Sequence, residues 1–156
     1  MDGLYHARVL ELAADIPHLG RLPTPAVGET RGAALKVSKV CGSTVEVALA
    51  LKNDIITAIA VNPHACALGQ ASTAILALNA VGARADEVLA ARDALRAMLK
   101  ENAAPPQGRF WELRHLEGVR DYPPRHASTL LAFEAAAEAI AQARAAAQEV
   151  ETCASS

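Results

Sequence analysis

The chain has 156 residues, of which 52% are hydrophobic and 21% charged, with a formal net charge of -2 at pH 7. This length fits one domain with its own core, and the interspersed acidic and basic residues exclude the basic surface typical of nucleic-acid binding. No apolar run approaches the ~20 residues that span a bilayer, so we expect no membrane segment. The first residues lack the pattern of a secretory signal, which predicts a cytoplasmic protein.

The first half of the chain predicts one helix followed by strands. Apolar residues at helical spacing indicate a short helix over Leu4–Ala14, and prolines with a glycine make Leu22–Thr30 an extended connector. Alternating apolar and polar residues predict strands over Ala33–Val40, Thr44–Leu51 and Ile55–Val61. Their short polar connections favour an antiparallel meander.

The second half predicts helices. The expected elements are Ala71–Val81, Asp86–Glu101, a short helix over Trp111–Val119 and a long alanine-rich helix over Ala127–Gln148. Strands first and helices afterwards predict an α+β domain, a small three-stranded antiparallel sheet with helices packed on one face. We expect residues 1–148 to form this domain and residues 149–156 to be a polar, frayed C-terminal tail.

Three cysteines, an odd number, argue against a disulfide framework in a reducing cytosol. Cys41 follows a predicted strand and precedes Gly42, which marks a turn that exposes the thiol. Cys66 lies where a strand gives way to a helix, and the positive end of a helix dipole favours a thiolate there. Taken alone, either cysteine is more often a small buried hydrophobic residue. Cys153 in the polar tail has no partner motif.

The arrangement resembles the U-type family of iron–sulfur cluster assembly scaffolds, IscU, SufU and the N-terminal domain of NifU. Ile16–Leu22 is a diverged form of that family's Asn-Pro-Arg-Asn-x-Gly-x-Leu stretch, and Val40–Ser43 falls where the family has Cys-Gly-Asp. The most specific match is His64–Ser72, which is similar to Gly-Cys-Ala-Ile-Ser-Gln-Ala-Ser. His115–Arg125 resembles the extra segment of the SufU branch, so SufU is the expected nearest relative.

The resemblance implies that three cysteines and one aspartate hold zinc or a transient iron–sulfur cluster, and that a cysteine desulfurase supplies sulfur as a persulfide. It carries the ligand positions to Cys41 and Cys66, but Ser43 replaces the aspartate and Ser128 replaces the third cysteine. Serine hydroxyls ligate zinc or iron far more weakly than thiolates or carboxylates do. Two of four ligands are therefore missing from the metal site.

Several neighbouring residues are further candidates. His64 and His126 border the predicted site and imidazole binds zinc and iron, although hydrogen-bonded or surface histidines are the commoner case. Arg125 corresponds to an arginine near the site in SufU-like chains and would stabilise a thiolate, the alternative being a solvated residue at a helix start. Phe110 and Trp111 would anchor a helix to the core or form an exposed docking patch, and we expect the core role.

The resemblance implies a scaffold rather than an enzyme, with Cys41 as the persulfide acceptor and Cys41 and Cys66 as ligands of iron or zinc. Its partners would be a cysteine desulfurase and recipient iron–sulfur apoproteins. Two chains would contribute four thiolates, which predicts a cluster shared in a homodimer. The alternative is a non-catalytic paralogue that keeps partner docking and has lost stable metal binding. An independent thiol enzyme using Cys66 and His64 lacks an orienting acid.

Overall fold

A computed structural model describes the backbone of residues 6–154 and the side chains of residues 6–150. The elements in chain order are α1 (Ala7–Ala14), β1 (Thr30–Val37), β2 (Thr44–Lys52), β3 (Ile55–His64), α2 (Ala67–Ala80), α3 (Ala85–Lys100), the 3-10 helices η1 (Gly108–Asp121) and η2 (Pro123–Arg125), and α4 (His126–Ala154). Within the described part of the chain, no helix combines the length and apolar character needed to cross a membrane.

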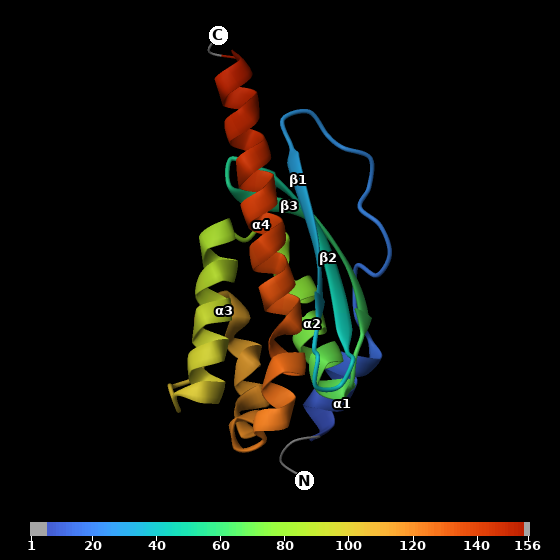
Figure 1. Ribbon diagram of the computed structural model, residues 1–156, viewed down its shortest axis with the longest axis vertical. Helices are drawn as coiled ribbons and strands as arrows, with labels where there is room; N and C mark the ends of the chain where they lie inside the picture. The colour runs from blue at the N-terminus through green and yellow to red at the C-terminus, as the bar shows by residue number, and fades with distance from the viewer. Residues whose placement is uncertain (1–5, 155–156) are drawn as a thin grey trace.

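The three strands form one antiparallel sheet in the order β1-β2-β3, which confirms the predicted α+β class and the meander. Alternate residues of β2 and β3, such as the paired Leu49 and Ile59, are buried beneath the helices. α4 contacts β1 and β2, and α2 contacts β3. In Figure 1, α4 runs along the sheet beside β1, and the turn after β1 lies at the end of the sheet nearest α1.

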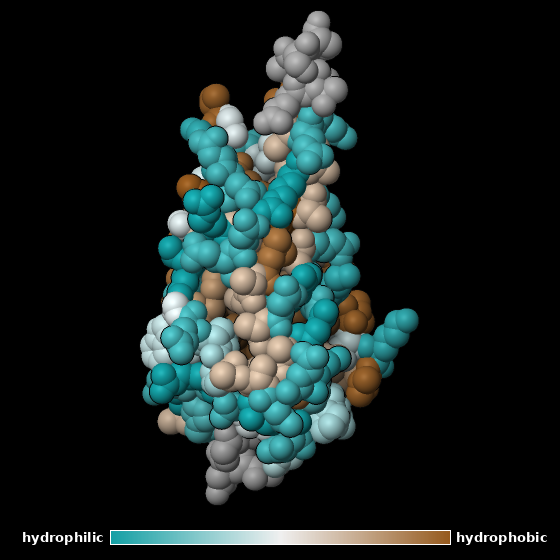
Figure 2. Space-filling view, turned by 90° about the vertical axis from the view of Figure 1, so that its left-hand side faces the viewer, coloured by the Kyte–Doolittle hydropathy of each residue, from teal (hydrophilic) through white to brown (hydrophobic). Residues whose placement is uncertain are grey.

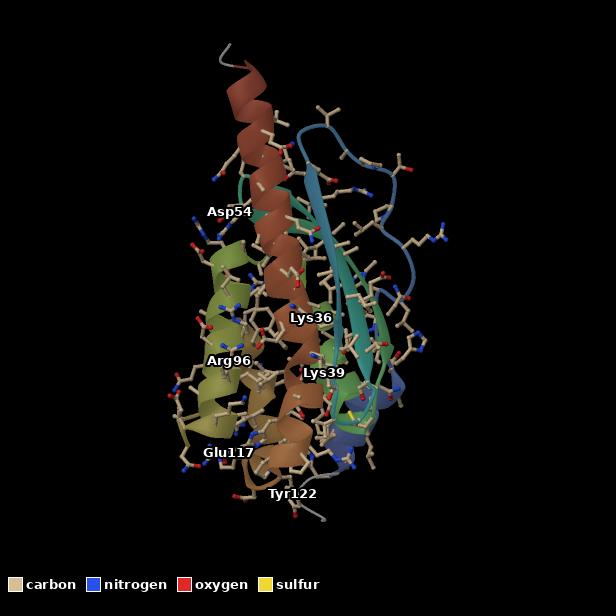
Figure 3. All side chains as sticks on the ribbon, viewed as in Figure 1. Lys36, Lys39, Asp54, Arg96, Glu117 and Tyr122 are labelled. Carbon is tan, nitrogen blue, oxygen red and sulfur yellow. The ribbon has the colours of Figure 1, made fainter. Side chains whose placement is uncertain are left out.

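α4 approaches β1 closely because small residues face each other. A Cβ atom added to Gly32 would meet the backbone of Ala139 and lie 2.9 Å from the amide nitrogen of Ala143. Polar contacts complete this edge: the Gln142 Oε1 atom accepts from the backbone N–H of Ala33, and Lys36, labelled in Figure 3, pairs with a glutamate of α4. The alanine-rich composition therefore serves close helix–sheet packing.

The remaining helices pack against this core. α3 packs on α4, α1 packs on α2, and η1 contacts both α2 and α3. Figure 2 shows the α3 side of the molecule, where hydrophilic side chains cover most of the surface around a band of weakly apolar residues. This distribution is expected for helices that turn one face inward.

The two rings at the start of η1 do not share one role. Phe110 is buried, with its ring centroid 5.7 Å from that of Phe133. Trp111 is 46% exposed, and the guanidinium of Arg114 lies 5.4 Å from its ring centroid. The prediction of a core anchor is therefore right for Phe110 and wrong for Trp111.

Some predicted boundaries were wrong. β1 ends at Val37 rather than at residue 40, because residues 38–43 close into a hydrogen-bonded turn. α2 begins at Ala67 rather than at residue 71, directly after Cys66. β3 continues to His64 through a proline, which is tolerated because that end of the strand pairs with β2 alone.

The ends of the chain also differ from expectation. α1 begins at Ala7, and Leu4 and Tyr5, where the helix was predicted to start, lie outside the described residues. The segment over residues 108–121 is a 3-10 helix with a kink at Phe110. α4 continues past Gln148 to Ala154, so most of the expected frayed tail is helical in backbone, while the side chain of Cys153 is not among those described.

Candidate functional site

Cys41 lies in a tight turn between β1 and β2. The backbone N–H of Ser38 donates to the carbonyl oxygen of Ser43, and the N–H of Gly42 donates to the carbonyl oxygen of Ser38, both over 2.8 Å. Gly42 adopts a φ of 74°, a conformation that glycine reaches without strain. The turn fixes the backbone and leaves Cys41 exposed to solvent.

Two hydroxyl groups contact the sulfur of Cys41. The Ser43 Oγ atom lies 3.1 Å and the Ser38 Oγ atom 3.5 Å from the Cys41 Sγ atom. The hydrogen bond with Ser38, then those with the hydroxyl and backbone of Ser43, lower the pKa of Cys41 from 9.0 to about 7, and the charge of Arg125 contributes in the same direction. Burial opposes this shift. Near pH 7 about half of an exposed thiol with this pKa is thiolate.

Cys66 is the residue that precedes the first turn of α2, and its side chain is partly buried. Its Sγ atom lies 3.7 Å from the Oγ atom of Ser128, a fully buried residue in the first turn of α4. Ser128 also donates a hydrogen bond of 3.2 Å to the carbonyl oxygen of Arg125. The second cysteine therefore also has a serine neighbour.

Strand pairing and helix packing bring these groups to one end of the molecule. Thr44, which follows the Cys41 turn, pairs with His64 at the end of β3. A Cβ atom added to Gly69 in α2 would lie 3.0 Å from the carbonyl oxygen of Ser128, so α2 and α4 are in close contact beside Cys66. In Figure 3, Lys39 marks the turn toward this end of the sheet, and Asp54 marks the opposite end.

In the described part of the chain, neither candidate histidine belongs to a cluster of three or more potential metal ligands. The Nε2 atom of His126 lies 3.0 Å and 3.2 Å from the carbonyl oxygens of Val119 and Arg120, so its donor serves the backbone. His64 is exposed at the end of β3. Among the described residues, no group of three or more His, Cys, Asp or Glu side chains is arranged to hold a metal ion.

Neither the distances nor the chemistry of both thiol–hydroxyl pairs fit a zinc site. In a tetrahedral zinc site with bonds of about 2.1–2.3 Å, neighbouring ligand atoms lie about 3.4–3.8 Å apart. The separation of 3.7 Å between Cys66 and Ser128 matches this, whereas that of 3.1 Å between Cys41 and Ser43 is shorter. Structural zinc sites use four thiolate or imidazole ligands, and two neutral hydroxyls do not fit that set.

Besides Ser43 and Ser128, the structure brings forward buried hydroxyl residues that the sequence did not single out. The buried polar side chains of the described chain are all hydroxyls: Ser38, Ser43, Ser72, Thr73, Ser128 and Thr129. Two belong to the Cys41 turn, two to the first turn of α4, and two to α2 within about two turns of Cys66. In the sequence, Ser38 is only a serine three residues before a turn cysteine. Its contact with the sulfur of Cys41 becomes visible only in the folded turn.

Comparisons with known proteins agree on one family. Over 92% of this chain and 96% of the other, the chain is 47% identical to a solved structure of a nitrogen-fixing NifU-like protein (N-terminal) from Brucella abortus, with a TM-score of 0.86. It is 29% identical over 100 residues to the iron-sulfur cluster assembly scaffold protein IscU of Streptococcus pyogenes serotype M1. That alignment covers 64% of this chain and spans only 63% of the length of the curated relative.

A third similarity concerns the fold alone. The structure of a putative iron-sulfur cluster assembly scaffold protein for the SUF system from Fervidobacterium islandicum AW-1 matches with a TM-score of 0.73 and 19% identity, covering 89% of this chain and 98% of that one. At this identity the likeness does not establish SufU as the nearest relative, and that part of the prediction stays a prediction. No family model matches the chain.

Proposed function

The chain belongs to the NifU/IscU-like scaffold family, and we propose that it serves iron–sulfur cluster assembly by accepting sulfur at Cys41. The observation that carries this proposal is the turn that exposes Cys41 and surrounds its sulfur with the hydroxyls of Ser38 and Ser43. A thiolate is the nucleophilic form of cysteine, and hydrogen bonds to sulfur favour that form. The chain then acts as a carrier or scaffold rather than as an enzyme.

The sulfur source would be a cysteine desulfurase, which presents a persulfide, and the products would reach recipient iron–sulfur apoproteins in the cytoplasm. The thiolate of Cys41 attacks the outer sulfur of the donor persulfide. The donor's S–S bond breaks, a new S–S bond forms on Cys41, and the donor leaves as a thiolate with the electron pair. The transferred sulfur keeps its oxidation state, so the step needs no oxidant or reductant.

Iron or a nascent cluster would be cargo rather than a resident cofactor. One chain offers the two thiolates of Cys41 and Cys66, and a four-cysteine cluster therefore requires a second copy. We expect cluster absorbance after anaerobic reconstitution only in the dimer fraction of a gel filtration. A cluster confined to monomers would contradict the shared arrangement.

The second candidate function is a paralogue that docks a desulfurase but builds no cluster. Its supporting observation is the replacement of two family ligands by Ser43 and Ser128, together with the missing third metal donor among the described residues. Such a paralogue would bind a desulfurase through its surface and leave both thiols unmodified.

One experiment separates the two functions. The full chain is incubated with a cysteine desulfurase and cysteine under anaerobic conditions, and persulfide is located by mass spectrometry. The carrier function predicts persulfide on Cys41, its loss in Cys41→Ser, and its retention in Cys66→Ala. Co-elution with the desulfurase without any persulfide would favour the paralogue.

A further inference from the structure

The two hydroxyls around Cys41 suit a thiolate better than a thiol. A thiol has one proton and can donate to one hydroxyl, whereas Ser38 and Ser43 both lie within hydrogen-bonding distance of the Cys41 Sγ atom. At least one hydroxyl must therefore donate to the sulfur. A thiolate accepts from both, so the pair is better matched to an anionic sulfur than to a neutral one.

The hydroxyl next to Cys66 donates its hydrogen bond to a backbone carbonyl rather than to the sulfur. Ser128 has a single proton, which it donates to the carbonyl oxygen of Arg125. Its oxygen is then left to accept a hydrogen bond from the thiol of Cys66, 3.7 Å away. The hydroxyls of Ser38 and Ser43, by contrast, have no described partner other than Cys41. The two cysteines thus have opposite hydrogen-bonding environments.

We propose that Ser38 and Ser43 are positioning residues for sulfur: their hydroxyls hold Cys41 and the persulfide that it receives, so that sulfur loading needs no bound metal ion. The inference rests on the proposed function and assigns it to one of the two cysteines. It also gives a role to Ser43, which stands at a position where the family resemblance places a metal ligand.

The same hydroxyls serve both directions of transfer. The outer sulfur of a persulfide lies about 2.05 Å beyond the Sγ atom, and the exposure of Cys41 leaves room for it. When an acceptor thiolate attacks this outer sulfur, the S–S bond to Cys41 breaks and Cys41 leaves as a thiolate with the electron pair. The hydroxyl donors stabilise that leaving group, and stabilised thiolates leave faster.

This chemistry also places the chain in a reaction sequence. A reaction that cleaves a carbon–sulfur bond and leaves the sulfur on a protein thiol must supply the persulfide. A thiol acceptor must consume it. Because the two hydroxyls stabilise the sulfur without a metal ion, loading does not require metal.

The test uses the full chain, stripped of metal with a chelator, and glutathione persulfide as the sulfur donor. Trypsin separates the two cysteines, since Cys41 lies in the Val40–Lys52 peptide and Cys66 in the Asn53–Arg84 peptide. Persulfide on each peptide is measured after alkylation. The variants are Ser38→Ala/Ser43→Ala, the matched control Ser128→Ala, and Ser43→Thr.

We expect metal-free wild-type protein to carry several times more persulfide on Cys41 than on Cys66, because only Cys41 has hydroxyls free to donate to its sulfur. At pH 7 the Ser38→Ala/Ser43→Ala protein should carry up to about sixfold less of this signal, because the smaller thiolate fraction outweighs the higher nucleophilicity of the more basic thiolate. Ser128→Ala should leave it unchanged, and Ser43→Thr, which retains a hydroxyl, should keep most of it. Unchanged thermal unfolding of the variants separates these effects from misfolding.

Three results would overturn the inference. Equal loading of both cysteines would remove the distinction between their environments, and full loading of the double alanine variant would remove the role of the hydroxyls. Loading that appears only after zinc is added would show that the metal is required. In each case the sulfur-accepting function would survive, whereas a complete absence of persulfide on Cys41, with or without zinc, would refute the proposed function itself.

Discussion

Removing the two hydroxyls beside Cys41 should make its thiol react more slowly than in the wild type at neutral pH and faster at high pH. In the Ser38→Ala/Ser43→Ala variant the sulfur loses the two side-chain hydrogen bonds that lower its pKa from 9.0 to about 7. The pKa then rises toward 9.0, held partly down by the backbone of Ser43 and the charge of Arg125, which remain. Reaction with a small neutral disulfide reports this change, because the thiolate is the attacking form.

The limiting magnitude follows from the two pKa values. At pH 7 the thiolate fraction falls from about one half to about one per cent, while the more basic thiolate is about eightfold more nucleophilic for a Brønsted slope of 0.4–0.5. The variant should therefore react up to about sixfold more slowly than the wild type at pH 7. Above pH 10, where both proteins are thiolate, it should react up to about eightfold faster.

The assay follows modification of the Val40–Lys52 peptide by mass spectrometry between pH 5 and 10.5, with the Asn53–Arg84 peptide of Cys66 as an internal reference. The two Cys41 profiles should cross between pH 7 and 10. A variant that is slower at every pH would indicate lost access to the thiol rather than a changed pKa. Identical profiles would show that the hydroxyls do not act on the sulfur.

Three further changes test other parts of the structure. Gly32→Ala places a methyl group against the backbone of α4, and urea unfolding should show a loss of about 3 kcal/mol or more. Asp54→Asn removes a carboxylate that accepts two hydrogen bonds from Arg144, which lower its pKa below 3.8. This stabilisation, about 1 kcal/mol after solvent screening, is present at neutral pH and is lost as the pH falls from 3.8 through the lower folded-state pKa, so wild type and variant should unfold alike in acid. Ser43→Asp/Ser128→Cys restores two ligand types, and metal analysis should show roughly tenfold more bound zinc than in the wild type; equal zinc would contradict the explanation for the weak site.

The fold could be predicted because its signals are local. Alternation of apolar and polar residues identified the three strands, and short polar turns at Gly42 and near Asp54 left few ways to connect them. The end of β1 was missed because a hydrogen-bonded turn, not the apolar pattern, ends it, and the start of α2 was placed four residues too late. The alternation of Leu35 to Ser38 was extended to residue 40, whereas the backbone hydrogen bonds of Ser38 with Ser43 and Gly42 close a turn there.

The site was only partly predictable for the same reason. Cys41, Cys66, Ser43 and Ser128 were found through a resemblance, and the structure places them in two thiol–hydroxyl pairs, although their function stays a prediction. Ser38 carries no motif, and its hydroxyl reaches the sulfur only because the turn folds back. Phe110 is buried and the neighbouring Trp111 exposed, next to a kink at Phe110, and a helical pattern does not reveal that difference.

The two serine replacements change chemistry more than geometry. Ser43 and Ser128 are both buried and sit on backbone that neighbouring elements hold in place: a hydrogen-bonded turn in one case and the contact with Gly69 in the other. A side chain at such a position can exchange one donor atom for another without moving the backbone. Since a hydroxyl that donates to sulfur stabilises a thiolate but binds zinc and iron weakly, Ser43 favours sulfur over metal at an unaltered location. On the proposed function, the chain would use its scaffold fold to carry sulfur without stable metal binding, because the two kinds of chemistry depend on different atoms.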